Sequence, residues 1–187
     1  MAKNPTINSF TNLRGVDGEV QKIQALMSFS WLTNAFGMAE IISGVPTQFN
    51  SNTSDPQPLT PNDQWVDYCF WTYAGSGTVI YGDGMDGMIM RKGKPSITYP
   101  VSCIFYMRLP GDKSYKIEKT DRRQEVIEFF DTLIGYPGVV TPSEYIDHSI
   151  QGVFEGFQLG EKEDRWFQLP YYGLRVNMDI TYKNYCA

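Results

Sequence analysis

The sequence predicts an α+β domain, in which a predominantly antiparallel β-sheet packs with two main α-helices. The last run, residues 171–183, alternates strictly between apolar and polar side chains, which is the period of a strand with one buried face. A segment that begins at Asp121 places apolar side chains at helical spacing. Aromatic residues make up 14% of the chain, and aromatic side chains favour strands.

Size and charge set further bounds. The 187 residues suit one domain, 1–187, with an inserted polar loop at about 46–64. A chain of this size buries roughly 70% of its extended surface, so a core forms without metals or disulfides. The net charge is −5 and the longest basic stretch is Arg91–Lys94, which argues against sequence-specific DNA binding.

The three cysteines do not form a disulfide framework, because their number is odd and small for a chain of this length. Cys69 and Cys103 lie in strand-like aromatic runs and are expected to pack as small apolar side chains, whereas Cys186 lies near the last residue. The first residues lack the apolar core of a secretion signal, and no apolar run approaches the roughly 18 residues of a membrane span. We therefore expect a cytosolic protein with no membrane partner.

The first third is predicted to begin with a helix from Asp17, its N-cap, to about Thr33. The apolar run 38–45 fits either a strand or a helix. Residues 46–63 are rich in Asn, Ser, Thr, Asp and Pro, and we expect a long loop without secondary structure. Such loops are usually functional or disordered.

Four strands are predicted in the middle of the chain, at 65–73, 78–81, 87–91 and 97–109. The glycines at 82 and 84 indicate a hairpin turn between the second and third. Pro100 lies inside the fourth run, and a proline there indicates an edge position or a bulge.

The last third is predicted to hold a helix from Asp121 to Ile134 and a terminal hairpin. Asp121 and Gln124 fit a capping box, and Gly135 is a candidate C-cap. The expected buried stripe consists of Val126, Ile127, Phe130, Leu133 and Ile134. The hairpin is expected to pair 150–158 with 171–183 across a charged turn at 160–165.

Residues with catalytic or metal-binding chemistry are sparse. The single histidine, His148, follows Asp147, but no Ser or Cys nucleophile is tied to it by spacing. The run 82–87 lacks the ligand spacing of a calcium loop, and one His with scattered Cys does not indicate a zinc site. Glu125, Glu128 and Asp131 fit a solvated helix face. We therefore predict no catalytic, cofactor-binding or metal-binding residues, and a protein that is not an enzyme.

The order of these elements resembles that of the bacteriophage tail terminator family, also called tail completion or neck ring proteins. Members have an N-terminal helix, then strands, then a strand that leads through a short linker into a second helix, and a C-terminal hairpin. The matching pieces here are the helix from Asp17, the strand Val101–Leu109 that ends at Pro110, the helix from Asp121 and the terminal run Gly173–Tyr182.

This resemblance implies a structural subunit of a virion, located at the neck or tail end and made in the host cytoplasm. It implies a homo-oligomeric ring, typically a hexamer, that caps the tail tube and joins it to the head through tail tube and head-completion proteins. DNA passes through such a ring without sequence-specific binding, and the acidic balance of the chain fits a channel that does not hold DNA. The family has no enzymatic activity.

If subunits form a ring, two segments are candidates for the contacts between them. One is the polar loop at 46–63, with Leu59. The other is the aromatic cluster Trp166, Phe167, Tyr171 and Tyr172. The alternative for the loop is a surface insertion, and the alternative for the aromatic residues is the core of the domain.

Two further functions fit the sequence. The chain could be a tail-tube or head-completion protein, which would also assemble. It could instead be a monomeric β-rich module in which Trp and Tyr stack on a carbohydrate or another ligand. Size in solution separates the module from the assembling proteins.

Overall fold

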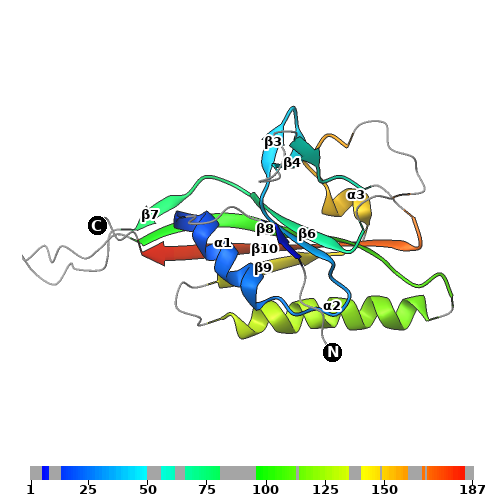
Figure 1. The fold of residues 1–187 in the computed structure, drawn as a ribbon. Coiled ribbons are helices and arrows are strands. Elements are labelled where there is room, and N and C mark those ends of the chain that lie inside the picture. Colours follow the sequence, from blue (N-terminus) through cyan, green and yellow to red (C-terminus); the bar gives the residue numbers. More distant parts are fainter. Residues whose placement is uncertain are drawn as a thin grey trace, which may run out of the picture.

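The computed structural model describes residues 6–8, 14–49, 56–61, 66–80, 96–112, 114–134, 140–147, 149–159, 166 and 168–183. Within them the chain has an α+β fold, as the sequence predicted, with a seven-stranded, mostly antiparallel sheet, a three-stranded sheet and three helices (Figure 1).

The large sheet has the strand order β1-β2-β6-β8-β10-β9, and β7 pairs with β8 beyond the end of β6. Pairing is parallel between β1 and β2 and between β2 and β6, and antiparallel elsewhere. Its strands are β1 Thr6–Asn8, β2 Asn34–Met38, β6 Tyr68–Tyr73, β7 Thr78–Ile80, β8 Ser96–Arg108, β9 Val140–Ile146 and β10 Tyr171–Lys183. The small antiparallel sheet consists of β3 Glu40–Ile42, β4 Val45–Phe49 and β5 Pro56–Pro58.

The three helices are divided between the two faces of the large sheet. They are α1 Gly15–Leu26, α2 Tyr115–Thr132 and α3 Ile150–Val153. Figure 1 shows α1 and α2 on one face, and α3 with the small sheet on the opposite face. The long central strands β8 and β10 therefore have packed elements on both sides.

The face under α1 and α2 holds the larger hydrophobic core, which we call the helix-side core. Alternate residues of β8 and β10 point into it, since successive side chains of a strand point to opposite faces. These strand residues are Val101, Cys103, Phe105, Met107, Tyr172, Leu174, Val176, Met178 and Ile180. The helices contribute Val16, Val20, Ile23, Val126 and Phe130, and Leu133 follows the end of α2.

The other face holds a smaller cluster under α3 and the small sheet, which we call the opposite core. Its members are Phe36, Ala39, Leu59, Tyr68, Phe70, Ile104, Tyr106, Ile150, Val153 and Phe154. Further along the same face, a polar network replaces apolar contact. There Arg175 Nε donates to Asn177 Oδ1 at 2.9 Å, and the buried Ser102 hydroxyl donates to the same oxygen at 2.7 Å.

Several sequence predictions are confirmed by the observed strands. The alternating run at 171–183 is β10 with the same bounds, and the run at 97–109 is β8 with its ends shifted by one residue. The predicted strands at 65–73 and 78–81 correspond to β6 and β7. The predicted strand at 87–91, the turn at 82–84 and the charged turn at 160–165 lie outside the described residues.

Pro100 occupies a break between two partner strands of β8. The pairing of β6 with β8 ends at Val101, and the pairing of β7 begins at Thr98. The Pro100 carbonyl oxygen accepts the Ala74 N–H at 2.9 Å, so the missing proline N–H faces the gap between β6 and β7. Pro100 therefore costs the sheet no backbone hydrogen bond, as would also be true at the predicted edge position.

The prediction for the second helix was wrong at its beginning. The helix α2 begins at Tyr115, and Asp121 lies inside it. The Gln124 side chain donates to Glu128 at 2.9 Å, one turn further along. No residue of the first two turns is fully buried and they carry no apolar stripe, so periodicity does not mark where they begin.

The far end of the predicted apolar stripe on α2 is also different. Val126, Phe130 and Leu133 are buried as expected, but Ile127 is only partly buried. Ile134 is 60% exposed, because α2 ends at Thr132 and the chain turns away. The candidate C-cap at residue 135 lies outside the described residues.

The first helix is shorter than predicted. It runs from Gly15 to Leu26, with Arg14 at the N-cap position, and Asp17 lies in its first turn. Residues 27–33 leave the helix and insert Met27, Phe29 and Leu32 into the helix-side core. Met27 and Trp31 are four residues apart, as on one helix face, so the sequence pattern continues past the residue where the helix ends.

The prediction of a strand at 150–158 was wrong. The segment begins with α3, whose Ser149 side chain accepts the Gly152 N–H at 2.9 Å as an N-cap. Ile150, Val153 and Phe154 are spaced as on one helix face and enter the opposite core. The outer partner of β10 is β9. The sequence did not reveal β9 because its middle residues are polar and exposed.

The prediction of a structureless loop at 46–63 was also wrong. Residues 45–49 and 56–58 form β4 and β5, which pair with each other. Thr47 and Gln48 are buried although they are polar. Polar residues can form a strand when their backbone is paired, so the polar composition of this segment did not exclude strands.

Candidate functional site

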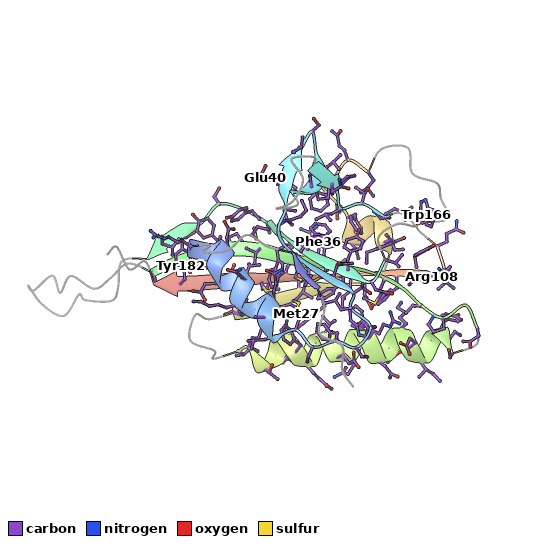
Figure 2. All side chains as sticks on the ribbon, in the orientation of Figure 1. Met27, Phe36, Glu40, Arg108, Trp166 and Tyr182 are labelled. Carbon is purple, nitrogen blue, oxygen red and sulfur yellow. The ribbon has the colours of Figure 1, made fainter. Side chains whose placement is uncertain are left out.

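The aromatic cluster predicted from the sequence lies near the start of β10. The rings of Trp166 and Tyr171 meet edge to face, with 5.2 Å between their centroids. Tyr171 also stacks on Tyr106 of β8 at 5.5 Å, and the Tyr106 hydroxyl donates to the Trp166 carbonyl oxygen at 3.2 Å. Trp166, labelled in Figure 2, is 8% exposed. The two residues therefore pack within the chain, against the opposite core.

The other predicted contact residues lie apart from this pair. Leu59 is 1% exposed and belongs to the opposite core, whereas Tyr172 is 5% exposed and belongs to the helix-side core. Phe167 lies outside the described residues. A subunit contact through Leu59 or Tyr172 would need surface that these side chains already bury within the chain. Their role in such a contact stays a prediction.

Asp67 joins three elements that are distant in the sequence. One carboxylate oxygen accepts the Arg108 N–H at the end of β8, at 3.0 Å, and the Arg122 guanidinium of α2, at 3.1 Å. Arg122 also pairs with Glu118 at 2.9 Å and lies 5.3 Å over the ring of Trp31. Burial raises the pKa of Asp67, although both arginines act to lower it. This joint fixes the beginning of α2 against the sheet, and no local sequence pattern indicated it.

The catalytic and metal-binding candidates of the sequence are only partly described. His148 and the glycine-rich run 82–87 lie outside the described residues. Asp147 pairs with Arg123 at 3.0 Å and accepts the Tyr172 hydroxyl at 3.4 Å. Among the described residues, no group of three or more His, Cys, Asp or Glu could hold a metal ion. No helix in those residues is long and apolar enough to cross a membrane.

Both described cysteines pack as small apolar side chains, as the sequence predicted. Cys69 and Cys103 are free, fully buried members of the helix-side core, and the Cys69 sulfur lies 3.8 Å from the Met27 sulfur. Burial raises the pKa of the Cys103 thiol well above its usual value, and the neighbouring Cys69 adds to the rise. A neutral, enclosed thiol is a poor nucleophile.

The sequence predicted that the acidic side of α2 is solvated, but two of its carboxylates accept hydrogen bonds from other elements. Glu125 accepts the Trp31 indole N–H at 2.7 Å, and Asp131 accepts the Tyr145 hydroxyl at 3.5 Å. A shallow cavity of ≈ 430 Å³ lies between this side of α2 and the segment that follows α1. It is lined by Ser28, Phe29, Ser30, Glu125, Glu128, Phe129 and Thr132.

A second open cavity, which we call the end groove, lies where β8 leads into α2 and where β10 begins. Its volume is ≈ 460 Å³, and it is lined by Pro110, Gly111, Asp112, Tyr115, Leu169 and Pro170. A backbone hydrogen bond joins its two walls, since the Leu109 N–H donates to the Pro170 carbonyl oxygen at 2.7 Å. Leu169 is 60% exposed at its edge. No local sequence pattern indicated this groove, because its walls come from segments that are distant in the sequence.

The β3–β4 hairpin, residues 40–49, is a second apolar feature, and it includes most of the run 38–45 that the sequence analysis left open between a strand and a helix. All three residues of β3 are exposed, with Ile41 at 48% and Ile42 at 39%. The two turn residues, Ser43 and Gly44, have φ of 51° and 78°, as a two-residue hairpin turn of type I′ requires. The pair Ser-Gly marks a turn in a sequence, but it is not among the pairs that most strongly predict a two-residue hairpin.

Three tyrosines form a cluster at the far end of the large sheet. Tyr99 stacks on Tyr182 at 6.4 Å, and Tyr73 meets Tyr99 at 5.6 Å. The Tyr73 hydroxyl donates to Asp17 of α1 at 3.4 Å. Burial raises the pKa of Asp17, and burial together with the Asp17 charge raises the pKa of Tyr73 to about 12. Tyr73 is 47% exposed, so this cluster presents an aromatic surface.

The chain matches no known protein-family model, and no curated protein is similar to it.

Proposed function

We propose that this chain is a structural subunit of a ring at the neck or tail end of a bacteriophage, where it caps the tail tube and joins it to the head. The proposal rests on the order and pairing of the elements. The helix α1 follows the short strand β1 and precedes the other strands, and β8 leads into α2. The chain then forms the antiparallel pair β9 and β10.

The structure changes one part of the order on which the resemblance rested. The resemblance called for a C-terminal hairpin, and the segment 150–158, which was expected to supply one strand, is not a strand. The pair of β9 and β10 provides the two antiparallel strands instead. Both long helices lie on one face of the sheet, and α3 and the small sheet lie on the other (Figure 1).

The test is the mass of the purified protein by light scattering at several concentrations, followed by electron microscopy of any large species. We expect a closed ring with a central hole, either alone or on purified tail tubes. A protein that stays monomeric at every concentration and does not bind tail tubes would overturn the proposal.

A second candidate, a monomeric carbohydrate-binding module, is favoured by the exposed tyrosine cluster. Stacked Tyr99 and Tyr182, exposed Tyr73 and the Asp17 carboxylate combine aromatic faces with a hydrogen-bond acceptor. Calorimetric titration with a panel of neutral oligosaccharides tests this function. Binding that Tyr73→Ala abolishes and Tyr145→Ala leaves unchanged would support it, and the absence of binding across the panel would exclude the oligosaccharides used.

A further inference from the structure

We propose that the β3–β4 hairpin of one copy of this chain inserts into the end groove of the next copy. The inference rests on the proposed function, because it names the contact by which the ring would assemble. It assigns the contact to surfaces that a single chain leaves exposed, and not to the buried Leu59 or Tyr172.

The hairpin is suited to insertion because it is both apolar and fixed in place. Ile41 and Ile42 are 48% and 39% exposed on a strand that pairs only with β4 in the described part of the chain. The Gly44 carbonyl oxygen accepts the Gln158 N–H at 2.8 Å, and the Pro46 carbonyl oxygen accepts the Leu59 N–H at 2.7 Å. A preformed hairpin loses little conformational entropy on binding.

The end groove is suited to receive an aliphatic side chain. Four of its six lining residues, Pro110, Tyr115, Leu169 and Pro170, offer apolar surface. The one carboxylate in the lining, Asp112, is held by hydrogen bonds from the Ser114 N–H, at 2.9 Å, and from the Ser114 hydroxyl. An aliphatic side chain that enters would therefore meet mostly apolar surface.

The charges beside the two surfaces are complementary. Glu40 and Ile42 lie on the same face of β3, because strand residues two apart point the same way. Among the described residues Glu40 forms no ion pair. The Lys116 ammonium lies 6.0 Å from the ring centroid of Tyr115, at the wall of the groove. With Ile42 in the groove of the next copy, Glu40 would face Lys116 across the contact.

The hairpin and the groove cannot meet within one chain. Figure 2 places Glu40 on the side of the large sheet away from α2, whereas Arg108 marks the end of β8 next to the groove. A contact between two different surfaces of the same chain is heterologous, and it generates a closed ring or an open filament. Such a contact is what a ring subunit requires.

The first test compares three variants by light scattering and electron microscopy. We expect Ile42→Asp and Leu169→Asp each to raise the protein concentration needed for assembly by about tenfold or more, as the loss of an apolar anchor does. Ile117→Asp is the matched control, since Ile117 is 66% exposed on α2 and does not line the groove. Circular dichroism checks that each variant is folded. Equal assembly of Leu169→Asp and Ile117→Asp would overturn the inference.

The charge pair gives an independent test. Glu40→Lys and Lys116→Glu should each weaken assembly, and the double variant should restore it. If the double variant assembles no better than the two single ones, Glu40 and Lys116 do not face each other and the proposed orientation is wrong.

Cross-linking separates this contact from others and from the proposed function. In a Cys186→Ser background, Ile42→Cys and Leu169→Cys proteins should form a disulfide dimer only when mixed. Self-linking of Ile42→Cys alone would show a symmetric contact between hairpins and overturn the inference. Mixed dimers without a closed ring would support the contact and contradict the ring. A ring without mixed dimers would support the ring and contradict the contact.

Discussion

The two faces of the large sheet are built on the same strands but by different means. On the face under α1 and α2, β8 and β10 present apolar side chains along most of their length. On the other face, apolar contact is limited to the end near α3, and a network around Arg175 and Asn177 takes over further along. The comparison shows that alternation along a strand identifies the better covered face but does not describe the other.

The difference has a physical cause in what lies over each face. The two long helices bring their own apolar stripes, and burial of such surface stabilises the fold by about 25 cal/mol for each Å². The short helix α3 and the small sheet cover only part of the other face. Further along this face, polar side chains of the described residues pair with each other, as when Asn177 donates to Glu144 at 2.9 Å.

The largest expected effect comes from removing a ring from the helix-side core. Phe105 is fully buried and contacts Phe29, Trp31 and Phe130. We expect Phe105→Ala to reduce the free energy of unfolding by about 3–5 kcal/mol, measured by urea denaturation. Leu59→Ala in the opposite core should cost roughly 2–3 kcal/mol, toward the lower end for a leucine, because the small sheet can relax toward the cavity.

The control for this pair is Ile134→Ala, whose side chain is 60% exposed and should change stability by less than about 0.5 kcal/mol. If Leu59→Ala proved as costly as Phe105→Ala, the opposite core would be as rigid as the helix-side core, and the comparison would fail.

A smaller effect is expected in the polar network. Asn177→Ala removes the acceptor of the buried Ser102 hydroxyl and of the Arg175 Nε, and this should cost about 1–3 kcal/mol. Burial lowers the pKa of Arg175, while Glu155 and Glu144 counteract the shift. Ser143→Ala is the control, because its exposed hydroxyl makes a single bond to a carbonyl oxygen. Equal stability of the two variants would show that the network contributes little.

The smallest effect is a pH dependence at the tyrosine cluster. The pKa of Tyr73 is raised to about 12 from 10.0, so the folded state favours its neutral form. Its contribution to stability is complete below pH 10 and is lost as the pH rises from 10 to about 12. Tyr73→Phe should therefore lose less stability than the wild type over this interval, as followed by denaturation at several pH values. The difference in tyrosine absorbance between the two proteins reports the titration of Tyr73. A difference curve with its midpoint near pH 10 would contradict the raised pKa of Tyr73.

How much could be predicted from the sequence varies with the kind of element. The terminal strand β10 was predicted with its bounds because its alternation runs for 13 residues. The edge strand β9 was missed, since Thr141, Ser143 and Glu144 are exposed and give no apolar signal. The segment at 150 was assigned to a strand because Ile150, Val153 and Phe154 are too few to separate one helical turn from a short strand.

The candidate surfaces were less predictable than the fold. The predicted contact residues are large and apolar, and such side chains tend to be buried within the chain. Leu59 and Tyr172 belong to the two cores, and Trp166 is buried beside the opposite core. The end groove requires Tyr115 and Leu169 to meet across 54 residues, and the sequence carries no record of that approach. The exposed isoleucines of β3 were visible in the sequence, but their exposure was not.

By itself the sequence determined the α+β class, the two central strands and the apolar stripe of α2 from Val126 to Leu133. These follow from local periodicity, because a strand or a helix repeats its buried face every two or about 3.6 residues. The tertiary structure decided the partner of β10, the beginning of α2 and the exposed surfaces. Each of these depends on residues that are distant along the chain, such as Asp67 and Arg122, whose contact only the packed fold brings about.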